Sequence, residues 1–158
     1  MFKLQGYCDS DWGASNDRRS ITGYGYKLCE KGPLISWKSR KQQIVALSTC
    51  EAEYVALTSA IQEAKFLSQL LVDMIGGRKT TATIYVDNQG AICLAKNPVH
   101  HQRTKHIDIR YHYIRTEIQS GAVELKYIPS CDNVADVFTK PVSKNRLNKF
   151  SSLRGNNV

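Results

Sequence analysis

Two short segments of the chain end in an aspartate directly after an apolar residue, Tyr7-Cys8-Asp9 and Tyr85-Val86-Asp87. Both segments lie at the end of an expected β-strand. In each, the aspartate comes two residues after the tyrosine, so the two side chains point to the same face of the strand. If the two strands are neighbours in a sheet, their ends present a pair of carboxylates. Paired carboxylates at a sheet edge are typical of a site for a hard cation.

A third carboxylate comes from a long amphipathic helix expected over residues 48–75. Ser48 and Glu51 form a capping box at its start. Glu51 faces the polar side of the helix, whereas Glu53 falls near the middle of the apolar stripe. A lone buried carboxylate costs several kcal/mol, so Glu53 requires a proton, an ion pair or a bound cation. The apolar stripe consists of Tyr54, Leu57, Ile61, Ala64, Leu67, Leu71 and Met74.

Asp136, in the first turn of a short helix expected near the end of the chain, completes a set of four acids. Carboxylates gathered closely raise each other's pKa unless cations lie between them, and oxygen-only ligands select Mg²⁺ or Mn²⁺. Each aspartate also has an ordinary explanation: Asp9 can begin a turn, Asp87 can cap a helix, and Asp136 suits a helix dipole. The four acids taken together, with Glu53 pointing inward, favour a metal site.

The elements that must position these acids follow from periodicity and turn residues. Three strands with short connections predict an antiparallel meander, and Trp37 of the third strand is expected in the core. The later strands alternate with helices, which predicts an α/β fold with a mixed sheet flanked by helices. The expected strands cover residues 4–9, 21–29, 34–40, 81–87 and 122–128, and the expected later helices cover residues 88–96, 107–118 and 132–139.

The composition of the 158 residues, with 42% hydrophobic residues, suits one domain with a buried core. A net charge of +8 favours a polyanionic partner such as nucleic acid, although charge alone leaves this open. No apolar run reaches the roughly 20 residues that cross a bilayer, and the first residues lack a signal peptide's apolar region, so we expect an intracellular protein without a membrane partner. Cysteines without a CxxC pair and histidines without an HExxH motif argue against zinc.

The acidic segments, together with several basic and aromatic ones, resemble the ribonuclease H domain of Ty1/copia-type retrotransposon polyproteins. The resemblance runs in the family's order from Leu4 to about Pro141. It implies a ribonuclease H-like fold, in which helices flank a five-stranded mixed sheet whose first three strands are antiparallel. The segments that carry it are residues 6–12 (GYCDSDW), 36–42 (SWKSRKQ), 47–54 (LSTCEAEY), 85–89 (YVDNQ), 104–108 (TKHID) and 135–141 (ADVFTKP).

By position, the family's catalytic acids fall on Asp9, Glu53, Asp87 and Asp136. Asp11 is a further candidate, because it shares the parity of Asp9 and the family pattern carries both. The resemblance implies two Mg²⁺ or Mn²⁺ ions, with Asp9 bridging both, Glu53 and Asp87 holding one, and Asp136 holding the other. The implied reaction is hydrolysis of the RNA strand of an RNA/DNA hybrid during reverse transcription. Cellular relatives place a histidine in the loop before the last acid, but residues 129–133 (PSCDN) contain none, so a histidine-assisted release of product lacks its residue.

The implied partners are the hybrid and a reverse transcriptase domain of the same polyprotein, in the cytoplasm within a virus-like particle or in the nucleus. The candidates for contact with the hybrid are Arg18, Arg19, Lys38, Arg40, Lys41, Asn88 and Gln89, although short basic runs are ordinarily solvated faces. We expect the ribonuclease H-like domain to cover residues 1–142, followed by a polar, basic, loosely held tail at residues 143–158.

Two alternatives to this function remain. An integrase- or transposase-like DNA nuclease shares the fold but is identified by a different acidic trio. A catalytically silent or domesticated domain would instead serve as a scaffold that binds nucleic acid or protein. The presence of all four acids favours the hybrid-cutting enzyme over the scaffold.

Overall fold

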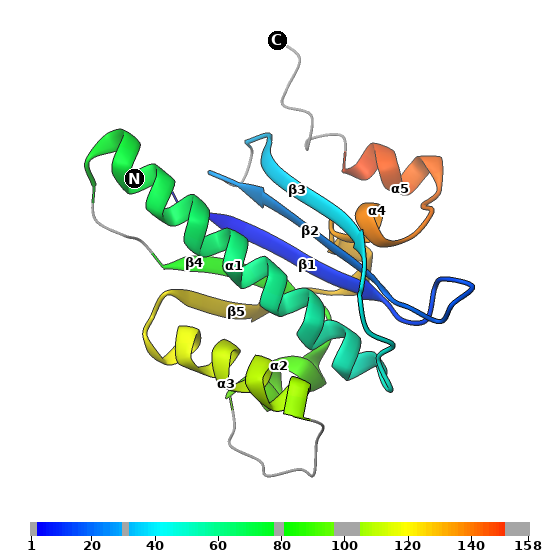
Figure 1. The fold of residues 1–158 in the computed structure, drawn as a ribbon. Coiled ribbons are helices and arrows are strands. Elements are labelled where there is room, and N and C mark those ends of the chain that lie inside the picture. Colours follow the sequence, from blue (N-terminus) through cyan, green and yellow to red (C-terminus); the bar gives the residue numbers. More distant parts are fainter. Residues whose placement is uncertain (1–2, 30–31, 78–80, 97–104, 151–158) are drawn as a thin grey trace.

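One mixed sheet with the strand order β3-β2-β1-β4-β5 forms the centre of the computed structural model, which describes residues 3–29, 32–77, 81–96 and 105–150 (Figure 1). The first three strands are antiparallel, whereas β4 pairs in parallel with both β1 and β5. This is the predicted mixed sheet. The strands are β1 (Gln5–Asp11), β2 (Ile21–Lys27), β3 (Leu34–Lys41), β4 (Ala82–Val86) and β5 (Val123–Tyr127).

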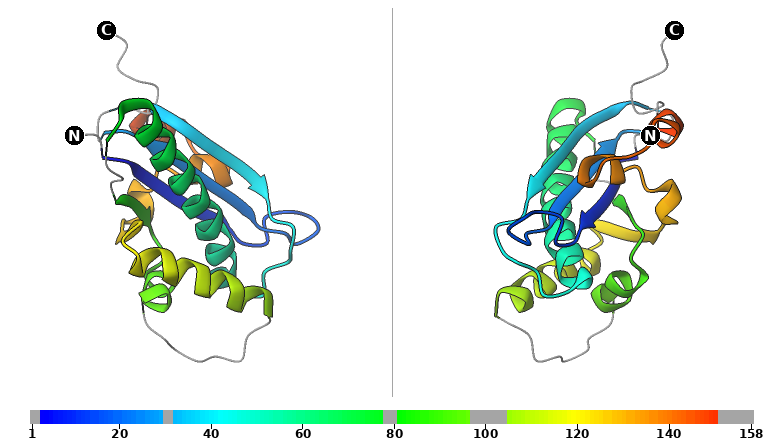
Figure 2. Two further views of the ribbon diagram at one scale, coloured as in Figure 1. Left: turned by 60° about the vertical axis from the view of Figure 1, so that its left-hand side comes forward. Right: turned by 90° about the vertical axis from the view of Figure 1, so that its right-hand side faces the viewer.

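Helices cover both faces of this sheet. The long helix α1 crosses one face, where it packs beside α3, and the short helices α4 and α5 lie on the opposite face (Figure 2). The acids of the expected site therefore come from three layers. The helices are α1 (Thr49–Ile75), α2 (Gln89–Lys96), α3 (Lys105–Gln119), a 3₁₀ turn at Ser130–Asp132, α4 (Asp136–Thr139) and α5 (Lys144–Lys149). None of the described helices is long and apolar enough to cross a membrane.

Both ends of α1 form as the sequence predicts. The Ser48 hydroxyl accepts a hydrogen bond from the Glu51 amide at 3.1 Å, and the Glu51 carboxylate accepts one from the Leu47 amide at 2.7 Å. At the other end Gly76 has a φ of 65°, a left-handed conformation that glycine adopts at little cost, and its amide donates to the Val72 carbonyl at 2.9 Å. These caps fix the phase of the helix and so the face on which Glu53 lies.

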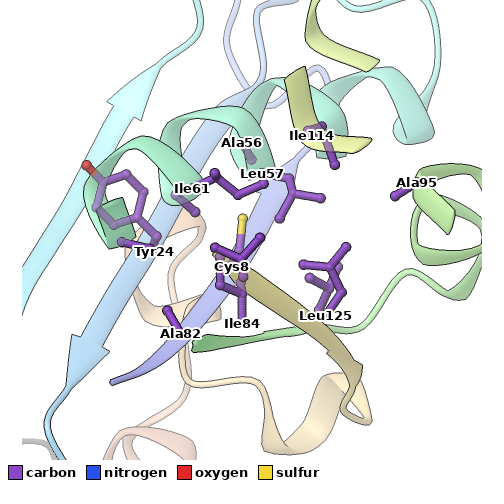
Figure 3. Close-up of a cluster of buried hydrophobic side chains, with 14 of the residues drawn as sticks. Cys8, Tyr24, Ala56, Leu57, Ile61, Ala82, Ile84, Ala95, Ile114 and Leu125 are labelled. Carbon is purple, nitrogen blue, oxygen red and sulfur yellow. The ribbon is translucent and has the colours of Figure 1, made fainter. Parts of the chain in front are cut away.

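The core lies between α1 and the central strands (Figure 3). Cys8 of β1 is fully buried and its sulfur points toward α1, where Leu57 and Ile61 cover it. Tyr26 of β2 is also buried under α1, and its hydroxyl donates to the Ala60 carbonyl at 2.5 Å. Since side chains alternate along a strand, Asp9 points to the other face of the sheet, one residue beyond the point where the pairing of β1 with β4 ends.

The opposite face of β2 is built for close approach by α4. Gly23 lies on that face, where an added Cβ would come within 2.5 Å of the Thr139 methyl carbon. The alternation Gly-Tyr-Gly-Tyr in β2 thus places small residues under α4 and large ones under α1. As a result α4 lies directly on the sheet beside Asp9.

Two expectations about burial are wrong. Met74 was placed in the apolar stripe, yet it is 72% exposed, because α1 extends past the edge of the sheet that it covers. Trp37 was expected in the core, yet it is 63% exposed. It lies on the edge strand β3 and stacks on Phe138 of α4, with ring centroids 5.6 Å apart.

The segment expected to be a loosely held tail begins with a helix in the described part of the chain. Residues 144–149 form α5, capped by Ser143, and Phe150 directly after it is only 5% exposed. Residues 151–158 lie outside the described residues, and the domain boundary at residue 142 stays a prediction.

Candidate active site

Three of the predicted acids meet at one end of the sheet. The parallel pairing of β1 and β4 places Cys8 opposite Val86, so the residues that follow them, Asp9 and Asp87, lie side by side. Glu53 reaches the same place from the first turns of α1. One carboxylate oxygen from each of Asp9, Glu53 and Asp87 lies within 4.8 Å of the other two. Among the described residues this arrangement suits an oxygen-only cation site.

Glu53 is held by one oxygen and leaves the other without a protein partner. The hydroxyl and the amide of Ser10 both donate to Glu53 Oε1, at 2.8 and 3.3 Å. Glu53 is 6% exposed, and its buried Oε2 accepts no hydrogen bond from the described residues. Because a buried carboxylate oxygen without a partner is costly, Oε2 is placed to bind a cation.

The electrostatics of the cluster favour a cation in the same way. Burial, with a smaller contribution from the neighbouring Asp9 carboxylate, raises the pKa of Glu53 from 4.5 to about 8. Burial also raises the pKa of Asp9 from 3.8 to about 7, against the lowering effects of Thr139 and Lys140. A divalent ion among these oxygens would reverse both shifts by stabilising the ionised forms.

Asp136 lies on the other side of Asp9 and outside the group of three. It begins α4 and is fully buried. The Lys140 ammonium lies between the two carboxylates, 3.1 Å from Asp136 Oδ1 and 3.9 Å from Asp9 Oδ2. Thr139 of the same helix donates its hydroxyl proton to Asp9 Oδ2. Asp9 is therefore central, with Glu53 and Asp87 on one side and Asp136 on the other.

Asp11, the further candidate, is not a member of the cluster. It is the last residue of β1, two positions beyond Asp9, and pairs with Ile21 of β2. It is half-buried, and its charge acts on Lys140. The structure thus brings Asp9, Glu53 and Asp87 together, sets Asp136 next to them, and leaves Asp11 at the rim.

An open depression of about 490 Å³ lies over the acids. Asn88 and Gln89, predicted to contact nucleic acid, line it beside Asp87. The Asn88 side chain also caps α2, since its Oδ1 accepts from the Ala91 amide at 2.9 Å. The depression is wide and open, which suits a phosphodiester backbone. Its lining comprises Asp9, Ser10, Thr49, Glu53, Asp87, Asn88, Gln89, Tyr127 and Ser130.

The basic candidates of β3 surround a second, smaller pocket of about 100 Å³. Lys38, Arg40 and Lys41 line it together with Arg110 of α3, a residue to which no sequence pattern points. Arg40 pairs across the sheet with Thr22, which in turn pairs with Ser10. Because directly paired residues point to the same face, this pocket lies on the sheet face that Ser10 and α1 share.

The remaining basic candidates, Arg18 and Arg19, lie in the connection from β1 to β2. Both are exposed, and Arg18 has a φ of 59°. Asp17 pairs with Arg19 at 3.6 Å and with Lys41 at 3.4 Å, which ties this connection to the end of β3. Pairs this exposed contribute little to stability, so these cations stay available to a polyanion.

Sequence reasoning missed four residues that act on the acids: Ser10, Thr139, Lys140 and Arg146. The spacing of four between Asp136 and Lys140 on a helix was a usable signal. Ser10 and Thr139 carry no local signal, because their contacts cross 43 and 130 positions of the chain. Arg146 was missed because its segment was expected to be a tail.

Several curated relatives of this chain are transposon proteins. The Pol polyprotein of transposon TNT 1-94 from Nicotiana tabacum is 40% identical over 153 residues, which is 96% of this chain and 11% of that polyprotein. The Pol polyprotein of transposon RE1 from Arabidopsis thaliana is 41% identical over 154 residues, covering 96% of this chain and 10% of the polyprotein. This chain is a homologue of Ty1/copia-type Pol polyproteins. It spans about a tenth of the length of the curated relatives it matches. No family model matches it.

Solved structures similar to this Pol homologue are ribonucleases H. LC11-RNase H1, isolated from compost, matches with a TM-score of 0.65 at 20% identity, over 95% of this chain and 99% of that one. A structure of LC11-RNase H1 in complex with an RNA/DNA hybrid matches with a TM-score of 0.59 at 20% identity, over 87% and 94% of the two chains. The chain has the ribonuclease H-like fold, and the resemblance seen in its sequence is confirmed.

Proposed function

We propose that this chain is a metal-dependent endonuclease that hydrolyses the RNA strand of RNA/DNA hybrids during retrotransposon reverse transcription. The observation that carries the proposal is the cluster of Asp9, Glu53 and Asp87, with ligand oxygens within 4.8 Å of one another at the carboxyl ends of two parallel strands. The transposon homologues and the ribonuclease H-like fold support it, as does the hybrid bound to LC11-RNase H1.

The residues present fit a divalent metal. Their donors are all carboxylate oxygens, and Glu53 Oε2 is buried without a hydrogen-bond partner among the described residues. Asp9, Glu53 and Asp87 would hold one ion, and Asp9 with Asp136 a second. When bound, the ions would supply an activated water and neutralise charge on the scissile phosphate and on the leaving 3′ oxygen.

The protein's own side chains then have separate tasks. Ser10 fixes Glu53, and Thr139 fixes Asp9 by donating to Oδ2, so both carboxylates are oriented before substrate arrives. Asn88 and Gln89 lie along the depression, where they can contact the sugar–phosphate backbone. The basic residues Arg18, Arg19, Lys38, Arg40 and Lys41 would bind backbone phosphates without reading base sequence.

The expected context is a reverse transcriptase domain of the same polyprotein, in a cytoplasmic virus-like particle or in the nucleus. Pol polyproteins as homologues support the first part of this expectation. The compartment stays a prediction.

One assay tests the function. The purified chain is incubated with a hybrid labelled separately on each strand, with Mg²⁺, with Mn²⁺, or with excess EDTA. We expect cleavage of the RNA strand only, in the presence of either metal only, while single-stranded RNA and duplex DNA stay intact, because recognition requires a 2′-hydroxyl on one strand and its absence on the other. Cleavage that persists in excess EDTA would contradict a metal site. Hybrid binding without any cleavage would instead support the silent scaffold.

A further inference from the structure

Asp136 differs from Glu53 and Asp87 because the protein itself supplies its cations. Its carboxylate is fully buried, with the Lys140 ammonium 3.1 Å from Oδ1 and the Arg146 guanidinium paired with Oδ2. A buried carboxylate needs such partners, since removal of one leaves an uncompensated charge. Among the described residues, by contrast, no ion pair involves Glu53 or Asp87.

Arg146 comes from α5, which follows the domain expected from the sequence. The helix is anchored at both ends: the Ser143 hydroxyl accepts from the Arg146 amide at 3.3 Å, and Phe150 is buried. The Arg146 guanidinium also donates to the Ser130 carbonyl in the connection before α4. Its Nε, however, is buried without a hydrogen-bond partner among the described residues. The guanidinium is thus directed at Asp136 but not fully satisfied there.

The two sides of Asp9 therefore have opposite electrostatic character. On the side of Glu53 and Asp87, the described residues bring carboxylates together and supply no ion-pairing cation. On the side of Asp136, two cationic groups already neutralise the carboxylate that a metal ion would bind. A divalent ion placed there would be repelled by both groups at short range, and its binding would require Asp136 to exchange a protein partner for the ion.

We propose that Arg146 and Lys140 compete with a second divalent cation for the carboxylate of Asp136. Arg146 is a positioning residue: it keeps Asp136 compensated and in place beside Asp9 when that side holds no ion, and it lowers the affinity of that side for a divalent ion. The two cation positions consequently fill at different concentrations, the Glu53 side first. This inference rests on the proposed function, from which the ion is taken to be Mg²⁺ or Mn²⁺. Arg146 does not have to contact the substrate.

The test is calorimetric titration of the metal-free chain with Mn²⁺ and with Mg²⁺. In Arg146→Gln we expect the weaker binding step to tighten by about 10-fold, while the tighter step is unchanged. The matched control is Lys144→Gln, which removes the same charge from an exposed position of the same helix and should titrate like the natural chain. If the natural chain shows only one step, Arg146→Gln should reveal a second.

Two further variants separate this role from a purely structural one. Lys140 is 38% exposed in its side chain, so Lys140→Gln should fold even if Arg146→Gln does not, and it should tighten the weaker step in the same direction. Arg146→Lys keeps the charge and should restore the natural titration. A merely structural Arg146 would lower the melting temperature without changing the binding steps.

The outcomes distinguish this inference from the proposed function. If Arg146→Gln and Lys140→Gln both titrate like Lys144→Gln, or if they weaken the second step, the competition is overturned even though the natural chain cuts the hybrid. If instead the natural chain lacks the tighter metal-binding step and does not cut the hybrid, the proposed function fails. The competition is then still tested by whether Arg146→Gln and Lys140→Gln each gain a metal-binding step. If none of the five chains binds an ion, both are overturned.

Discussion

Ser10 of β1 and Glu53 of α1 are joined by two hydrogen bonds at the end of the sheet where the acids meet. Both polar hydrogens of Ser10 are donated to the same carboxylate oxygen, at 2.8 Å from the hydroxyl and 3.3 Å from the amide. The other oxygen, Oε2, is buried and has no hydrogen-bond partner among the described residues, and one oxygen of this carboxylate lies within 4.8 Å of oxygens of Asp9 and Asp87. Ser10, which follows Asp9 in β1, thus holds the carboxylate of Glu53, which belongs to helix α1.

Removal of the Ser10 hydroxyl should loosen Glu53 without removing a ligand. We expect Ser10→Ala to lower metal affinity or hybrid cleavage by about 10-fold, because residues that orient metal ligands have effects of this size. The measurement is the rate of cleavage as a function of Mg²⁺ concentration. Ser120→Ala, which removes a hydroxyl that donates to the Glu117 carbonyl at the end of α3, is the control and should behave like the natural chain. Equal rates in both variants would contradict the orienting role.

The metal-free chain should lose stability as the pH rises from about 6 to about 8.5. The pKa of Asp9 is raised to about 7 and that of Glu53 to about 8, above their ordinary values of 3.8 and 4.5. In this window the folded chain retains protons that the unfolded chain has released, so stability falls with pH until both groups are ionised. Thermal melts in EDTA should show that the melting temperature decreases by several degrees over this pH range.

A variant and a metal serve as controls for this pH dependence. Glu53→Gln removes one of the two titrating groups and should flatten the upper part of the window. Added Mg²⁺ should reduce the slope in the natural chain, because a bound cation favours the ionised carboxylates. A melting temperature that rises over the same window, or an identical slope in Glu53→Gln, would count against the buried carboxylate cluster.

Affinity for the hybrid should depend steeply on salt and weakly on sequence. Arg40 and Arg110 line one pocket on the α1 side of the sheet, where they can neutralise backbone phosphates. Each of Arg40→Gln and Arg110→Gln should weaken binding and lower the slope of log Kd against log salt concentration by about one. Lys3→Gln, at the opposite end of β1, should leave the slope unchanged. A flat salt titration of the natural chain would favour a protein partner.

Local rules could predict which faces three of the acids take, but not that Asp136 lies beside the other three. Strand parity set the faces of Asp9 and Asp87, and the helix phase set by Ser48 distinguished Glu53 from Glu51. Those rules hold because hydrogen-bond geometry within a strand or a helix fixes which face each side chain takes. The mixed sheet with an antiparallel first part also followed from the pattern of a meander and then alternating elements, whereas the neighbouring positions of β1 and β4 are known from the structure alone.

Other features depend on where an element ends in space, which no local pattern contains. Met74 continues the apolar period of α1, but a helix of 27 residues spans about 40 Å, more than twice the roughly 17 Å of β4, so its last turns leave the sheet. The sequence around Trp37 suits a core position, and its exposure follows from the place of β3 at the edge of the sheet, which the local sequence does not determine. Arg146 lies in a polar segment, and only its pairing with Asp136 shows that the segment packs on the domain.

We expect catalysis to take place at the carboxylate cluster to which α1 contributes Glu53. Two single-atom changes, two positions apart on one helix, test it. Glu53→Gln removes a ligand charge, so hybrid cleavage should drop by at least about 100-fold. The stability of the metal-free chain should hold near neutral pH and rise above about pH 8, where the natural Glu53 is ionised and repelled by its neighbours, and the stabilisation by added Mg²⁺ should shrink.

Glu51→Gln is the matched control, since glutamine preserves the cap at the Leu47 amide and residue 51 lies outside the cluster. The decisive measurement is the rate of RNA-strand cleavage in a labelled hybrid with Mg²⁺ for the natural chain and these two variants. We expect Glu51→Gln to cut at nearly the natural rate and Glu53→Gln to be almost inactive. An active Glu53→Gln beside an inactive Glu51→Gln would show that the wrong face of α1 has been assigned to the site.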